Sequence, residues 1–150
     1  KFLFEASKDE EVFFLAWTTT PWTLPSNLGL TVGGNIDYVL VKTFNPFTHN
    51  SVHVILAKNL AGKYFDEKNK DLKFEDYKPG DKAIPFKVIS EFKGSELEGI
   101  KYEQLLQFAQ PADGDAFRVV LGDFVTTDDG TGIVETITPS QRNHHKCVQQ

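Results

Sequence analysis

The residues best suited to chemistry lie in one short stretch, residues 16–27. It holds four threonines, both tryptophans of the chain and two prolines, and three of the hydroxyls are consecutive, on Thr18, Thr19 and Thr20. Hydroxyl groups donate and accept hydrogen bonds, so they can orient a water molecule, a sugar or a carbonyl group. No recognisable base accompanies them in the sequence to make one a nucleophile. The stretch therefore indicates positioning of a substrate and an attacking water rather than covalent catalysis.

The elements around this stretch should hold it rigidly. An apolar run, residues 12–15, predicts a buried strand that ends at the threonines. Alternation along a strand would place Thr18 and Thr20 on one face and Thr19 on the other. Pro21 lacks a backbone donor and forces Thr20 out of the helical region, so we expect a stiff, kinked segment. A threonine run by itself is more often an ordinary strand end.

The rest of the chain alternates short apolar runs with turns. This pattern predicts a mostly β fold with a few short helices, an α+β arrangement with a β-barrel-like body. Hairpins are expected from residues 38–43 with 52–57, where His49 and His53 would lie at the surface, and from residues 1–6 with 12–18. Further strands are predicted over residues 86–92, 117–121 and 132–134, and short helices over 58–65 and 103–109.

Composition limits the class of protein. The 150 residues are 40% hydrophobic and 25% charged, which suits one globular domain with a real core. The net charge of −5 argues against a free-standing nucleic-acid binder, but not against a domain that receives the end of a nucleic acid held elsewhere. Cys147 is the only cysteine, so no disulfide and no metal site are expected. We expect no membrane association and a cytoplasmic location, and the lack of methionine suggests a piece of a longer protein.

Three motifs carry a resemblance to a known family. Residues 17–27, Trp-Thr-Thr-Thr-Pro-Trp-Thr-Leu-Pro-Ser-Asn, resemble the threonine-rich motif in the editing domain (connective peptide 1) of isoleucyl-tRNA synthetases. The related leucyl and valyl enzymes carry Thr-Thr-Arg-Pro there, so Thr20 and Trp22 favour the isoleucyl branch. Residues 94–102 match Gly-x-x-Leu-x-Gly-x-x-Tyr of the same domains, and residues 130–134 match Gly-Thr-Gly-x-Val. The resemblance covers residues 4–134.

The resemblance implies the β-barrel-like editing fold and hydrolysis of valine wrongly attached to the isoleucine tRNA. A pocket for isoleucine rejects valine only weakly, because one methylene is worth about 1–3 kcal/mol, a general figure for which isoleucyl enzymes are the usual example. A second, smaller pocket then removes the error. By match to the motif, Thr18, Thr19 and Thr20 are the catalytic candidates.

The substrate-binding candidates follow from the same match. Trp22 and Thr23, held between two prolines, would be rigid pocket walls, and Asn27 would bind the tRNA end or cap a turn. Glu135 and Thr136 stand where the family has His-Thr. The implied partners are the 3′ end of the aminoacylated isoleucine tRNA, the valine moiety or valyl-adenylate, and the remainder of the synthetase chain. No cofactor is implied for this piece, since ATP and magnesium belong to the synthetic site of the full-length enzyme.

The chain departs from the family pattern at its end. Glu135 stands in place of the histidine, and His144 falls where the catalytic aspartate would be. We therefore take residues 1–136 as the editing domain and residues 137–150 as a divergent, disordered or non-native tail. The alternative to a hydrolase is a catalytically impaired or truncated editing domain that only binds the aminoacylated tRNA 3′ end.

Overall fold

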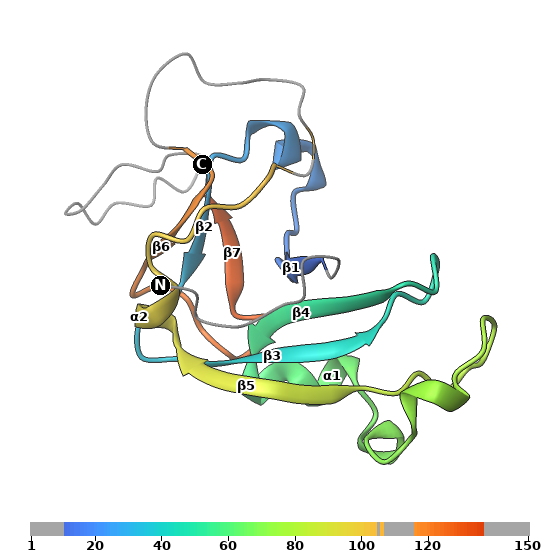
Figure 1. The fold of residues 1–150 in the computed structure, drawn as a ribbon. Helices are drawn as coiled ribbons and strands as arrows, with labels where there is room; N and C mark the ends of the chain where they lie inside the picture. Colours follow the sequence, from blue (N-terminus) through green and yellow to red (C-terminus); the bar gives the residue numbers. More distant parts are fainter. Residues whose placement is uncertain (1–10, 105, 107–115, 137–150) are drawn as a thin grey trace.

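The computed structural model describes residues 11–104, 106 and 116–136. In these residues the chain forms two mixed β-sheets joined by short helices and loops (Figure 1). The predicted mostly β class is confirmed, although neither sheet closes into a barrel within the described residues. The predicted tail, residues 137–150, lies outside them, and so do residues 1–6 of the first predicted hairpin.

The larger sheet contains four strands in the order β1-β4-β3-β5. Strands β3 and β4 form the predicted hairpin, with Tyr38 opposite Ala57 and Thr43 opposite Val52. Strand β5 pairs antiparallel with the other edge of β3, and β1 pairs parallel with β4. The strands are β1 Val12–Phe14, β3 Asp37–Phe44, β4 Ser51–Ala57 and β5 Lys87–Lys93.

The smaller sheet has three strands in the order β6-β2-β7 and stands across one end of the larger one (Figure 1). Its strands are β2 Gly29–Val32, β6 Arg118–Leu121 and β7 Ile133–Thr136. Strand β2 pairs parallel with β6 and antiparallel with β7. All four residues of β2 are buried, because it has a neighbour on each side.

The helices are short. The helix predicted over residues 58–65 is a 3-10 turn followed by one α-helical turn. The prediction of a helix over residues 103–109 is wrong for the three of these residues that the structure describes, because residues 103, 104 and 106 are not helical. The helices are η1 Pro21–Ser26, η2 Lys58–Leu60, α1 Ala61–Tyr64, η3 Glu67–Asn69, η4 Phe74–Asp76 and α2 Gly94–Leu97. No helix among the described residues combines the length and apolar character needed to cross a membrane.

Two local predictions are corrected by long-range pairing. The strand predicted at residues 12–15 ends at Phe14 and is half-buried rather than buried, with Phe13 45% exposed. His53, predicted at the surface, is only 4% exposed, because β4 lies between β1 and β3. Sequence periodicity indicates that a strand forms but not which strands will flank it.

The core has two parts, one on each face of β3. Tyr38 and Leu40 face the smaller sheet and pack with residues such as Ile133. Val39 and Val41 face the opposite side and pack with Leu56 and Phe86, and Ala61 of α1 packs against that cluster. This two-residue alternation is the strand period read from the sequence. It leaves the end of β7 beyond the core, where the candidate site lies.

Candidate functional site

Two segments far apart in the sequence meet beside the smaller sheet. After β1 the chain reaches Trp17, which forms an isolated parallel bridge with Val134 of β7. The Trp17 N–H donates to the Ile133 carbonyl at 3.2 Å. Because the bridge is parallel, the threonines that follow Trp17 run beside the residues that follow Val134. The threonine-rich motif and the end of the Gly-Thr-Gly-x-Val motif thus form two walls of one site.

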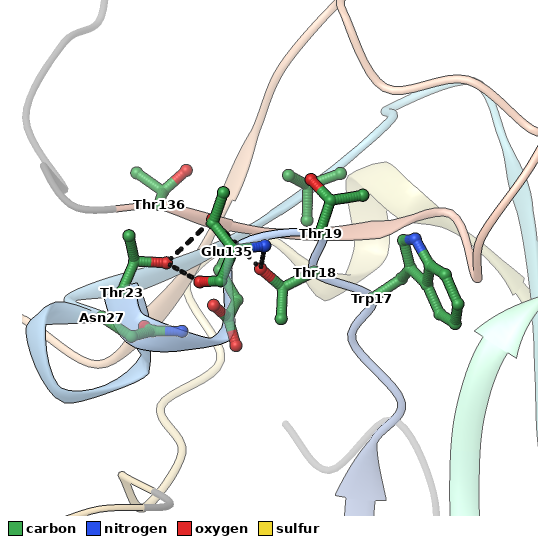
Figure 2. A pocket seen from close by; sticks show the side chains of 9 residues that line it. Trp17, Thr18, Thr19, Thr23, Asn27, Glu135 and Thr136 are labelled. Atoms are coloured by element: carbon green, nitrogen blue, oxygen red, sulfur yellow. Dashed lines mark hydrogen bonds between the residues drawn. The ribbon is translucent and has the colours of Figure 1, made fainter.

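Hydrogen bonds hold the threonine side chains together (Figure 2). The Thr20 N–H donates to Thr18 Oγ1 at 3.1 Å, and the two Oγ1 atoms lie 3.4 Å apart. Thr20 Oγ1 lies 3.1 Å from Thr23 Oγ1, which donates to the Thr20 carbonyl at 2.6 Å. Thr20 and Thr23 face the same way because residues three apart are aligned at a 3-10 turn.

The three consecutive threonines are separated as expected, but for a different reason. Thr18 and Thr20 are half-buried and joined, whereas Thr19 is exposed. The strand ends at Phe14, so the local hydrogen bonds, not strand alternation, produce the separation. Thr20 has φ −126° and ψ 69°, outside the helical region, directly before Pro21 as predicted.

A pocket of about 300 Å³ opens between these walls. Seven of the eight predicted site residues line it, and Trp17 and Val134 complete the lining. Those two residues were not among the predicted site residues, although Trp17 belongs to the threonine-rich motif and Val134 to the Gly-Thr-Gly-x-Val motif. The lining residues are Trp17, Thr18, Thr19, Thr20, Thr23, Asn27, Val134, Glu135 and Thr136.

Trp22 is the predicted site residue that does not line the pocket. It is 74% exposed, and the predicted wall is formed instead by Trp17, which is 50% exposed. The helix η1 explains the difference: Thr20 and Thr23 occupy its inner side, and an intervening residue of a 3-10 turn points elsewhere. Figure 2 shows Trp17 at the edge of the pocket, beside Thr18.

Asn27 and Glu135 both line the floor of the pocket. The Tyr102 hydroxyl, outside the lining, donates to Asn27 Oδ1 at 2.6 Å. Asn27 is 9% exposed, and this bond joins residues 75 positions apart in the sequence rather than capping a local turn.

Burial sets the electrostatics of this floor. Desolvation raises the pKa of Glu135, and the hydrogen bond from Asn27 partly opposes that shift in pKa. Burial, followed by the nearby charge of Glu135, raises the pKa of Tyr102, so its hydroxyl stays protonated and can donate. Glu135 Oε2 is buried and has no hydrogen-bond partner among the described residues. Glu135 is the only ionisable side chain in the described lining.

Other titratable groups lie away from the pocket lining. Asp129 pairs with Lys63 across 3.3 Å and is 87% exposed, in the turn before β7. His49 Nδ1 lies 3.0 Å from the Tyr77 hydroxyl, in the loop after β3. Across the described parts of the chain, no three His, Cys, Asp or Glu residues form a group that could hold a metal ion.

The sequence relatives of this chain are isoleucine–tRNA ligases. The chain is 64% identical over 125 residues to the enzyme of Cytophaga hutchinsonii, a match covering 83% of this chain and 11% of the relative. It is 59% identical over 122 residues to that of Bacteroides fragilis (81% and 11%), and 44% identical over 133 residues to that of Clostridium tetani (89% and 10%). The chain thus spans about a tenth of the length of these curated relatives. No protein-family model matches it.

Solved structures with the same fold are synthetase editing domains. The editing domain of the P. falciparum cytosolic leucyl-tRNA synthetase superposes with a TM-score of 0.60 at 16% identity, covering 87% of this chain and 42% of that one. The P. knowlesi domain gives 0.57 at 15% identity, covering 85% and 46%. By sequence the chain therefore corresponds to a segment of the isoleucine–tRNA ligase family, and by structure it has the fold of a synthetase editing domain.

Proposed function

We propose that this chain is the editing domain of an isoleucyl-tRNA synthetase and hydrolyses the ester that joins valine to the isoleucine tRNA. The observation that carries the proposal is the pocket in which the threonine-rich motif meets the end of β7. Its lining combines a hydroxyl network with one shielded carboxylate. The similarity to isoleucine–tRNA ligases and the fold of leucyl editing domains support the same assignment.

Hydrolysis of an ester needs an oriented water and stabilisation of charge on the carbonyl oxygen. In this proposal the hydroxyls of Thr18, Thr19 and Thr20 orient the water and the terminal ribose. The network that joins Thr18, Thr20 and Thr23 is already formed, so little reorganisation is needed when substrate binds. Water attacks the ester carbonyl carbon, the bond to the ribose oxygen breaks, and valine leaves with the tRNA hydroxyl restored.

Selection against isoleucine would come from the size of the pocket. Its volume of about 300 Å³ lies at the lower end of the range for ligand sites. Trp17 and Val134 provide apolar walls, and the bridge between them fixes their separation. A side chain with one more methylene would clash with rigid walls, and exclusion by clash discriminates more strongly than a loss of contact.

The remaining parts of the proposal concern partners and setting. The 3′ end of the aminoacylated isoleucine tRNA enters the pocket, or valyl-adenylate does, and Asn27 and Thr136 contact it there. The remainder of the synthetase chain holds the tRNA body, since a net charge of −5 gives this segment little affinity for phosphates. The segment needs no cofactor of its own and works in the cytoplasm.

Deacylation assays test the proposal. The chain is incubated with the isoleucine tRNA carrying either valine or isoleucine, and we expect release of valine only. Thr19→Arg places a long side chain at the exposed wall of the pocket and should abolish release without changing the melting temperature. Thr48→Arg is the matched control, because Thr48 is exposed in the loop after β3 and does not line the pocket. Full activity of Thr19→Arg would contradict the proposed role of the threonines.

One observation favours a second candidate function, a binding module without turnover. The position where the family has histidine holds Glu135, and the position of its aspartate falls at His144, outside the described residues. If those replacements remove catalysis, the chain binds a non-hydrolysable valyl-adenosine and releases no valine from tRNA. Binding with turnover excludes this second candidate.

A further inference from the structure

Three consecutive carbonyl groups in the turn before β7 each accept a hydrogen bond. The Thr131 carbonyl accepts from the last N–H of β4 at 2.8 Å, and the Gly132 carbonyl accepts from the Tyr38 hydroxyl at 2.6 Å. The Gly130 carbonyl accepts from the Tyr64 hydroxyl at 3.0 Å. Tyr38 is fully buried, whereas Tyr64 is 41% exposed and lies outside the core. The function proposed above gives Tyr64 no role.

The backbone that carries Tyr64 is anchored on both sides. Tyr64 is the last residue of α1, and this helix follows Leu60, which is buried in the part of the core beside the smaller sheet. After the helix, the ring of Phe65 lies 5.2 Å from that of Phe86, in the other part of the core. Lys63 also reaches the turn, but both partners of its ion pair are half exposed or more, so that contact adds little stability. The Tyr64 hydroxyl is therefore the stronger of these two links between α1 and the turn.

The turn meets the wall of the pocket at Gly130. This glycine is buried, and its φ is +72°, in the left-handed region. A Cβ at residue 130 would lie 3.2 Å from the Cβ, Cγ and Cδ1 atoms of Trp17, closer than ordinary van der Waals contact. The base of the Trp17 indole thus lies directly on the Gly130 backbone, at the edge of the pocket (Figure 2). The Trp17 N–H donates to the Ile133 carbonyl, so the same segment holds both the backbone and the ring of Trp17.

We infer that Gly130 is the seat of the Trp17 indole and that Tyr64 is a positioning residue that fixes this seat, so that the two residues determine how large an amino acid the pocket admits. The inference rests on the proposed function, because it concerns the wall that would exclude isoleucine. Half of the Trp17 surface is exposed, so neighbouring side chains hold the indole only in part. A wall excludes an extra methylene only if it cannot yield, and the contact with Gly130 prevents the indole from yielding.

Tryptophan fluorescence tests the seat without any ligand. The chain has two tryptophans, so Trp22→Phe leaves Trp17 as the only one. In this background Tyr64→Phe keeps the ring and removes the hydroxyl that holds the Gly130 carbonyl. The Stern–Volmer constant for acrylamide quenching of Trp17 should rise by about 1.5- to 2-fold, because a loosened indole samples more exposed positions although half of its surface is exposed already. Tyr77→Phe, which removes a hydroxyl bonded to His49 in the loop after β3, is the control and should leave the constant unchanged.

Two non-hydrolysable ligands measure the size limit by calorimetry. They are 3′-valylamino-3′-deoxyadenosine and its 3′-isoleucylamino counterpart, which differ by one methylene, and the measured quantity is the ratio of their dissociation constants. The wild-type chain should prefer the valyl ligand by about tenfold or more. Tyr64→Phe should reduce this preference by about two- to tenfold, the value of one hydrogen bond, because the isoleucyl ligand binds more tightly while the affinity for the valyl ligand is unchanged. A merely structural loss would weaken both ligands alike, and Tyr77→Phe should change neither.

A double variant tests whether Tyr64 acts through the indole. Trp17→Ala removes the indole and should lower the preference for the valyl ligand at least as much as Tyr64→Phe does. Adding Tyr64→Phe to Trp17→Ala should then have no further effect, because coupled residues are not additive. Gly130→Ala should also raise the quenching of Trp17, but it adds strain at a positive φ, so Tyr64→Phe decides the question.

The outcomes separate this inference from the proposed function. If the wild-type chain binds neither ligand, the proposed function fails and the size limit with it, whereas the quenching experiment, which contains no ligand, still decides whether Tyr64 seats the indole. If the wild type prefers the valyl ligand and Tyr64→Phe keeps both that preference and the wild-type quenching, the proposed function stands and this inference is overturned. If Tyr64→Phe changes the ratio equally in the presence and absence of the Trp17 indole, Tyr64 does not act through that wall.

Discussion

Replacing Tyr38 by Phe removes one oxygen atom from the place where the two sheets join. Tyr38 lies on β3 and has no exposed surface. Its hydroxyl accepts from the Gly33 N–H at 2.9 Å and donates to the Gly132 carbonyl at 2.6 Å. Gly33 follows β2 and Gly132 precedes β7, so this one oxygen connects the larger sheet to two strands of the smaller sheet.

The size of the effect follows from the two groups that are left unpaired. Gly33 and Gly132 are both buried, and each unsatisfied buried group costs about 1–3 kcal/mol. The variant no longer buries a hydroxyl, which returns about 1–2 kcal/mol. The two groups together cost about 2–6 kcal/mol, so the net loss of unfolding free energy should be about 1–4 kcal/mol. For a chain of 150 residues this corresponds to a fall in melting temperature of about 2–16 °C.

Urea denaturation, followed by tryptophan fluorescence and by circular dichroism, measures the change. The control is Tyr77→Phe, which removes a hydroxyl from a half-buried ring bonded to His49 and should cost less than about 1 kcal/mol. Coincident transitions by the two probes would justify a two-state analysis. A loss for Tyr38→Phe no larger than that of the control would show that the Tyr38 hydroxyl oxygen does not hold the two sheets together.

Two further changes test particular contacts. Gly94→Ala should destabilise the chain by about 3 kcal/mol in a urea titration, because a Cβ at residue 94 would lie 2.0 Å from the Gly33 carbonyl oxygen. The control is Gly62→Ala, on α1 with nothing within 4 Å, which should be neutral or stabilising by about 0.5–1 kcal/mol. Equal changes in unfolding free energy for the two variants would contradict the close packing at Gly94. Burial raises the pKa of Glu135, so the folded wild type is stabilised while this carboxyl is protonated, below the ordinary carboxyl range, and it loses stability as the pH rises through the raised pKa. Gln cannot ionise, so the stability of Glu135→Gln relative to wild type should increase as the pH rises. Melting curves from pH 4 to pH 8 that run parallel for the two proteins would show that ionisation of Glu135 has no energetic cost.

Local structure was the part of the fold that the sequence predicted best. The β3–β4 hairpin follows from two apolar runs around a polar loop, and its partners agree with the prediction. The break at Thr20 follows from Pro21, whose ring restricts the residue before it. Both features depend on neighbours in the sequence, which is where propensities and turn chemistry act.

Contacts between segments far apart in the sequence could not be predicted from local sequence patterns. Nothing in the periodicity indicates that β1 pairs parallel with β4, or that His53 is consequently buried. The Trp17–Val134 bridge, which creates the pocket, joins two motifs that the sequence shows only separately. The family motifs predicted that both contribute to one site, and seven of the residues predicted from them line the pocket. Trp22 lies outside the lining, because the motif does not reveal the direction of side chains in η1.

In the proposed function, the pocket between the threonine-rich motif and β7 receives the aminoacylated end of a tRNA. Methyl NMR of threonine-labelled protein, with 3′-valylamino-3′-deoxyadenosine as the ligand, tests whether this pocket binds such an end. We predict that the methyl signals of the lining threonines, Thr18, Thr19, Thr20, Thr23 and Thr136, shift on titration, whereas those of Thr43 and Thr48 do not. Shifts confined to Thr43 and Thr48, or no shifts at millimolar ligand in the folded chain, would contradict the account.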